Sequence, residues 1–147
     1  MPKQLMFQIK DRLGDIAFQL EEKSAKRIYI SVHKSDLRQV ARVLFNEFKA
    51  RFSIASGMDN GKNFEILYHF SFDDLNKLIS VRTFIEKDSP AVDSLVPVLG
   101  PCVEWIEREM HELLGIYFAG HPNLKRLLLS EDWPEGVYPL RRDFKNV

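Results

Sequence analysis

The chain has 147 residues, which suits a single domain with a core of useful size. Lysine and arginine together number 21, as do aspartate and glutamate, so no bulk charge draws the chain to nucleic acid or anionic lipid. The only cysteine, Cys102, excludes an internal disulfide and an iron–sulfur cluster held by this chain alone, and we expect it to be a small buried apolar residue.

The first fifty residues predict a helix, two strands and a second helix. Apolar residues four apart favour the first helix, and alternation of apolar and polar residues favours the strands. Ser35 and Asp36 are expected to cap the second helix, which carries one apolar stripe. The predicted bounds are a helix over residues 3–14, strands over 16–21 and 27–33, and a helix over 37–50.

A hairpin and a third strand are predicted next. Asn60 and Gly61 form a strong hairpin signal, because both residues accept positive φ. The predicted strands cover residues 51–57, 63–72 and 78–86. One face of the middle strand comprises Phe64, Ile66, Tyr68 and Phe70. These elements predict an α+β fold, in which an antiparallel meander is covered by helices and followed by an extended C-terminal tail.

Proline and glycine mark the end of the folded domain. Residues 87–101 are predicted to be a connection, Pro101 suits the first turn of a helix, and Gly115 is a natural helix stop. Periodicity fades beyond that point. The tail nevertheless carries large apolar residues that a disordered linker would lack, namely Trp133, Tyr138, Leu140 and Phe144. We therefore predict an α+β domain over residues 1–115 and a partner-binding tail over 116–147.

The stretch from Met110 to Pro122 resembles a zinc-protease helix only in part. His111, Glu112 and His121 fall on the extended H-E-x-x-H template, but Gly115 replaces the second histidine. Glu107, one helical turn before His111, is available as a third ligand, or as the partner of His111 in an exposed pair. A free-standing metal-dependent enzyme that uses His111 and His121 is therefore the alternative function.

The aromatic residues of the middle strand suggest a second alternative. Phe64, Tyr68 and Phe70 are spaced like the stacking platform of a single-stranded RNA binder. Lysine and arginine are not concentrated beside them, which favours an ordinary core face. Nucleic acid is accordingly not expected as a partner.

Mixed charge follows the predicted last helix and continues into the tail. Acidic and basic residues alternate there and are interleaved with aromatic residues. Such a pattern is typical of a protein–protein docking surface, where charge pairs set register and specificity.

Residues 107–144 resemble the 30-kDa subunit family of respiratory complex I, which is the bacterial NADH–quinone oxidoreductase. The first motif is EREMHELLGIYFAGHPNLKRLL, and the second is Asp-Trp, a turn, then Pro-Leu-Arg-Arg-Asp-Phe. The resemblance implies that motif residues serve structure and partner contact. They are Glu107, Arg108, Glu109, Glu112, Leu113, Leu114, His121, Pro122, Lys125, Leu127, Leu128, Asp132, Trp133, Pro139, Leu140, Arg141, Arg142, Asp143 and Phe144.

The resemblance implies a non-catalytic subunit with no active site, cofactor or metal of its own. It would dock on the 49-kDa large subunit or on the related nickel–iron large subunit. A small iron–sulfur subunit is the other expected partner. Iron–sulfur clusters, and nickel and iron where present, are expected in these partners. The complex would couple electron transfer to ion pumping.

Two further features bear on the type of complex and its location. Residues 135–139, EGVYP, stand where respiratory members usually have Gly-His-Pro, which is more similar to members in membrane-bound energy-converting hydrogenases. No stretch approaches the ~18 to 20 apolar residues of a membrane span. Charged residues at 10–12 stand where a signal peptide would be apolar. We therefore expect a peripheral protein on the cytoplasmic face of the membrane.

Overall fold

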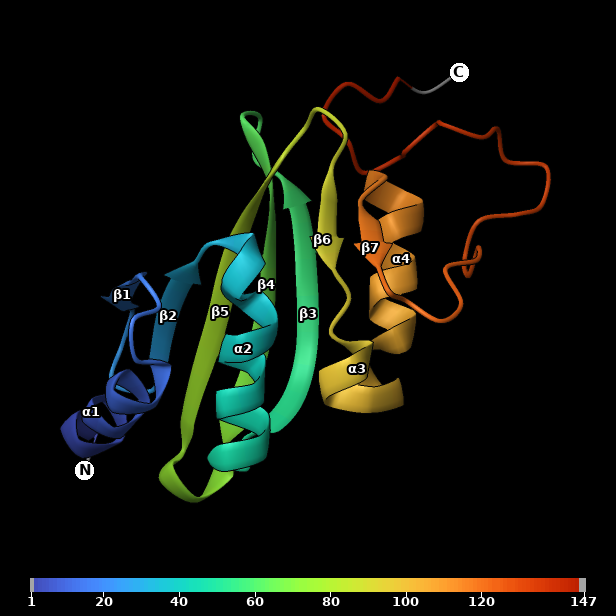
Figure 1. Cartoon of the computed structure of the whole chain (residues 1–147). Coiled ribbons are helices and arrows are strands. Elements are labelled where there is room, and N and C mark those ends of the chain that lie inside the picture. The colour runs from blue at the N-terminus through green and yellow to red at the C-terminus, as the bar shows by residue number, and fades with distance from the viewer. Residues whose placement is uncertain (1, 146–147) are drawn as a thin grey trace.

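The computed structural model describes residues 2–145 and contains one five-stranded sheet with helices on one side (Figure 1). The strand order is β1-β2-β5-β4-β3. The strands are β1 (Phe18–Glu22), β2 (Arg27–Val32), β3 (Arg51–Asp59), β4 (Asn63–Phe72) and β5 (Lys77–Glu86). The helices are α1 (Pro2–Leu13), α2 (Leu37–Arg42), α3 (Val96–Leu99) and α4 (Glu104–Leu114). The predicted α+β class is confirmed.

The sheet is mixed, which corrects the prediction of an antiparallel one. Strands β3, β4 and β5 form the expected antiparallel meander, and β1 pairs antiparallel with β2. Strand β2 instead pairs parallel with β5, with Ile30 beside Val81. Alternation along a strand fixes which face is buried but not which strand lies beside it. The parallel neighbour follows from the crossover through α2, which returns the chain to the far edge of the sheet.

The start of the second helix differs from its prediction. A 3₁₀ turn, η1 (Lys34–Asp36), precedes α2, and the ring of His33 caps it by accepting a hydrogen bond from the Ser35 N–H at 3.2 Å. Asp36 makes no side-chain capping bond, so the predicted caps are wrong. The helix then widens into a π-helical turn, η2 (Val43–Glu47).

The predicted hairpin and its buried face are confirmed. Asn60 accepts hydrogen bonds from the N–H groups of Lys62 and Asn63, while only Gly61 of the predicted pair takes a positive φ. Phe64, Ile66, Tyr68 and Phe70 are all fully buried. A base cannot stack on them in the folded chain, so the RNA-platform alternative is wrong.

The connection over residues 87–101 is more structured than predicted. It contains β6 (Ala91–Asp93), which pairs parallel with β7 (Tyr117–Ala119), as well as α3 and the 3₁₀ turn η4 (Gly100–Val103). Pro101 lies in η4, directly before α4. Cys102 is exposed, contrary to expectation, because η4 turns it away from the core.

The predicted tail begins inside the core. Ile116 and Phe118 are buried, and β7 ties this part of the chain to β6. Residues 120–145, here called the C-terminal segment, have no helix or strand and pass around α4 toward the tip of the β3–β4 hairpin (Figure 1). Within residues 2–145, no helix is long and apolar enough to cross a membrane.

Candidate functional site

Helix α4 points the acidic residues of the motif in different directions. Glu107 faces the core and is fully buried. Its carboxylate accepts hydrogen bonds from Tyr68 Oη at 2.8 Å, Ser94 Oγ at 2.5 Å and the Leu95 N–H at 2.9 Å. One side chain therefore joins strand β4, the loop before α3, and α4.

Burial governs the protonation of this cluster. Desolvation raises the pKa of Glu107, and the hydrogen bonds from Leu95, Ser94 and Tyr68 offset only part of that rise. Burial and the neighbouring carboxylate also raise the pKa of Tyr68. The cluster is a structural junction, because each of its polar groups is already paired within it.

Glu112 and Arg108 hold the C-terminal segment by its backbone. Glu112 is buried and accepts three N–H groups, those of Leu127 at 3.1 Å, Leu128 at 2.9 Å and Leu129 at 2.9 Å. Arg108, one turn earlier, donates to the carbonyl oxygens of Lys125 at 3.0 Å and Arg126 at 2.7 Å. These charge-assisted bonds fix the path of the segment whatever side chains it carries.

The end of the C-terminal segment is anchored on the C-terminus of α4. Arg141 Nε donates to the Leu114 carbonyl at 2.7 Å, a free acceptor at the helix end. Its guanidinium lies over the rings of Tyr138, at 4.3 Å, and Phe64, at 5.1 Å. The Leu140 N–H donates to the Leu113 carbonyl at 3.1 Å.

A second anchor joins the segment to the β3–β4 hairpin. The Arg142 N–H donates to Asp59 Oδ2 at 2.9 Å, and Lys87 Nζ lies 2.5 Å from Asp59 Oδ1. Desolvation pushes the pKa of Asp59 up, but Lys87 and the N–H groups of Arg142 and Gly61 outweigh it and lower that pKa to about 2. Asp59 is therefore ionised at any physiological pH and holds the segment through its charge.

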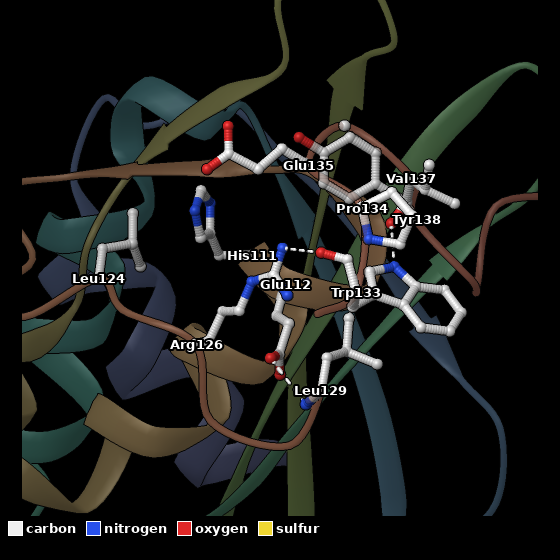
Figure 2. Close-up of a pocket in the computed structure, with 11 residues that line it drawn as sticks. His111, Glu112, Leu124, Arg126, Leu129, Trp133, Pro134, Glu135, Val137 and Tyr138 are labelled. Atoms are coloured by element: carbon white, nitrogen blue, oxygen red, sulfur yellow. Dashed lines mark hydrogen bonds between the residues drawn. The ribbon is translucent and has the colours of Figure 1, made fainter. Parts of the chain in front are cut away.

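Between these anchors the segment arches away from α4 and encloses a pocket of about 330 Å³. Figure 2 shows the side chains of His111, Arg126 and Trp133 around it. Arg126 donates to the carbonyls of Ser130, at 2.6 Å, and Trp133, at 2.5 Å. The Trp133 indole donates to the Val137 carbonyl at 2.8 Å and packs on Phe144 with ring centroids 6.0 Å apart.

The two histidines of the metal hypothesis bind backbone atoms. His111 Nδ1 lies 2.8 Å from the Ile116 carbonyl. His121 Nδ1 accepts the Asn123 N–H at 3.0 Å, which leaves Nε2 to donate to the Glu104 carbonyl at 2.9 Å. Glu107 is turned into the core. Residues 2–145 contain no group of three or more His, Cys, Asp or Glu side chains placed to hold a metal, so the geometry gives this hypothesis no support.

The other predicted motif residues lie on the surface. Glu109 is half-buried on α4, whereas Pro122, Lys125, Asp132 and Asp143 are exposed on the C-terminal segment. Ser130 donates to Asp132 at 2.5 Å. The structure therefore brings most of the predicted partner-contact residues onto this chain's own backbone, and it leaves this smaller set facing outward.

An apolar groove of about 390 Å³ lies on the outer side of this arrangement. Its most exposed large residues are Ile54 of β3, Trp105 of α4 and Leu128 of the C-terminal segment, at 54%, 67% and 63% exposure. Sequence reasoning missed Trp105, and the available signal was its position off the apolar stripe of α4. Ile54 gave no such signal, because a β-bulge between Phe52 and Ile54 decides which way it points.

Gly115 is the residue that lets the segment close onto α4. It has φ +82°, and a Cβ atom there would lie 2.5 Å from Arg141 Nη2 and 2.7 Å from the Tyr138 ring. Strain from positive φ and overpacking should together make Gly115→Ala cost about 3 kcal/mol in the free energy of unfolding. Urea denaturation followed by tryptophan fluorescence measures this loss.

Gly136→Ala is the matched control for that variant. Gly136 has a similar φ of +76°, but no atom lies within 4 Å of the added Cβ. Its expected cost is therefore the backbone strain alone, about 1 kcal/mol. Equal losses for the two variants would contradict the close packing of Arg141 and Tyr138 on Gly115.

The chain resembles known proteins over most of its length. The sequence profile of the family described as "Respiratory-chain NADH dehydrogenase, 30 Kd subunit" matches residues 30–146. The NADH-quinone oxidoreductase C subunit of Nocardioides sp. is 32% identical over 124 residues, which are 80% of this chain and 48% of that protein. The NAD(P)H-quinone oxidoreductase J subunit of Prochlorococcus marinus is 36% identical over 124 residues, which are 78% of this chain and 69% of that protein.

A solved structure shares the fold. It is described as the membrane-bound sulfane sulfur reductase, an archaeal respiratory membrane complex, and one of its chains matches with a TM-score of 0.83. The match covers 98% of this chain and 85% of that chain at 22% identity. The chain spans 48% to 64% of the length of three bacterial relatives that are C subunits of NADH-quinone oxidoreductase.

Proposed function

The chain belongs to the 30-kDa subunit family of respiratory-chain NADH dehydrogenase, and we propose that it is a non-catalytic, peripheral subunit of a complex I-like membrane redox complex. The observation that carries the proposal is the groove beside α4. Three large apolar side chains from three separate elements stand exposed together there. Exposed apolar clusters of this kind are typical of protein–protein contacts.

The proposed partner is the large subunit of the complex, of the 49-kDa type or its nickel–iron relative. Glu112 and Arg108 support this role by fixing the C-terminal segment against α4, so that α4 and the segment offer one preformed surface. In this proposal residues 1–115 form the domain and residues 116–147 the partner-binding tail. The first few tail residues also complete the core.

Electron transfer is proposed to occur in the partner subunits. A small iron–sulfur subunit and the large subunit would hold the clusters and any nickel, while this chain would bind no cofactor. The chain would sit at the cytoplasmic face of the membrane and support electron transfer coupled to ion pumping. Its closer similarity to hydrogenase-type members stays a prediction, because the relatives described above are named as quinone oxidoreductase subunits.

Affinity purification of the tagged full chain from gently solubilised source membranes tests this proposal. Mass spectrometry of the co-purifying proteins is expected to identify a large subunit and a small iron–sulfur subunit. A nickel–iron large subunit would indicate a hydrogenase-type complex, and flavin- and NADH-binding subunits would indicate complex I. Recovery of no membrane-complex subunit would contradict the proposal.

A further inference from the structure

The groove beside α4 is built from residues that have little freedom to move. Phe52 forms its floor and packs edge-on to Phe70 at 5.9 Å. Leu127 and Leu128 form one wall, and the Glu112 carboxylate holds both of their N–H groups. A preformed apolar surface loses little conformational entropy when a partner binds, which favours a specific contact.

The rim of the groove is acidic. Glu109 lines it, and Glu104 lies on the other side of Trp105 along α4. Neither carboxylate forms an ion pair within residues 2–145, whereas the nearby Arg108 is engaged with backbone carbonyls. The rim therefore carries uncompensated negative charge beside exposed apolar side chains.

We propose that this groove receives one protruding apolar side chain of the large subunit, flanked there by a lysine or arginine that pairs with Glu109. The inference rests on the proposed function and adds the place and chemistry of the contact. Trp105 acts as the central anchor, since tryptophan is enriched among the residues that dominate interface energies. The Glu109 pair sets the register of the contact.

Another exposed aromatic residue provides a control surface. Phe7 of α1 is 71% exposed, close to the 67% of Trp105. Its surroundings differ, because the nearby Arg12 and Glu47 pair with each other at 3.5 Å. The side chain of Phe7 is not joined by other strongly exposed apolar residues in its pocket, and the inference assigns it no partner.

A photo-reactive amino acid placed at position 128 of the full chain identifies what occupies the groove. The chain is produced in its source cells, irradiated and purified with its complex, and the cross-linked peptide is sequenced. The expected peptide comes from the co-purifying large subunit and has an apolar residue beside a lysine or arginine. The same probe at position 7 should give no cross-link to that subunit.

Two substitutions measure the strength of the contact. Trp105→Glu and Glu109→Arg should each lower recovery of the large subunit about tenfold or more, while Phe7→Glu leaves it unchanged. All three positions lie outside the buried core, and circular dichroism checks that each variant folds. Wild-type recovery with both groove variants, or a cross-link from position 7 alone, would overturn the groove assignment but leave the proposed function standing. Absence of any membrane-complex subunit from the wild-type preparation would overturn both.

Discussion

Replacing Glu107 with alanine is expected to lower the free energy of unfolding by on the order of 3 kcal/mol. The variant leaves Tyr68 Oη, Ser94 Oγ and the Leu95 N–H without their common acceptor in a fully buried site. Each unpaired buried donor carries a desolvation cost, and the lost volume adds a cavity. Urea denaturation measures the change, and a loss below about 1 kcal/mol would contradict the junction role.

Glu107→Gln is the control that separates hydrogen bonding from charge. Glutamine keeps an acceptor oxygen for the Leu95 N–H, and the hydroxyl groups of Tyr68 and Ser94 can both donate and accept. This variant should therefore lose no more than about 1 kcal/mol.

The pH dependence of the same pair checks the protonation of Glu107. Because burial raises its pKa, the folded chain binds this proton more tightly than the unfolded chain does. The resulting stability is fully present below the ordinary carboxyl pKa and is lost as pH rises through the raised value. Wild type should therefore lose stability relative to Glu107→Gln as pH rises from about 4 to about 8, and parallel pH profiles would contradict the shift.

Replacing Glu112 with alanine is expected to free the C-terminal segment from α4. The N–H groups of Leu127, Leu128 and Leu129 lose their shared carboxylate. Hydrogen bonds to a charged acceptor are worth about 2 kcal/mol, so exchange of these three amides should speed up by about 30-fold or more. Hydrogen-exchange mass spectrometry of residues 125–130 measures this opening.

Glu109→Ala is the matched control, because it removes the same charge from the adjacent part of the same helix. The Glu109 side chain makes no hydrogen bond within residues 2–145, so the exchange of the three amides should not change. Unaltered exchange in Glu112→Ala would show that the segment is held by other contacts. Loss of partner recovery in both variants, with faster exchange only in Glu112→Ala, would separate the positioning role of Glu112 from direct contact by Glu109.

The sequence by itself determined the local elements and the identity of the motif residues. Alternation over residues 63–72 fixed the buried face of β4, since the period of a strand is two whatever surrounds it. Gly115 ended α4 as predicted, because few other residues accept its positive φ. The motif itself was legible because its charged and apolar residues stand at fixed spacing.

Only the tertiary structure decided which atoms those residues contact. Charge pattern alone assigned Arg141, Arg142 and Glu112 to a partner surface, but in the folded chain they bind Leu114, Asp59 and the backbone of residues 127–129. The parallel pairing of β2 with β5 and the outward turn of Ile54 were equally out of reach. Local patterns fix the faces of helices and strands, whereas contacts between distant segments depend on how the whole chain closes on itself.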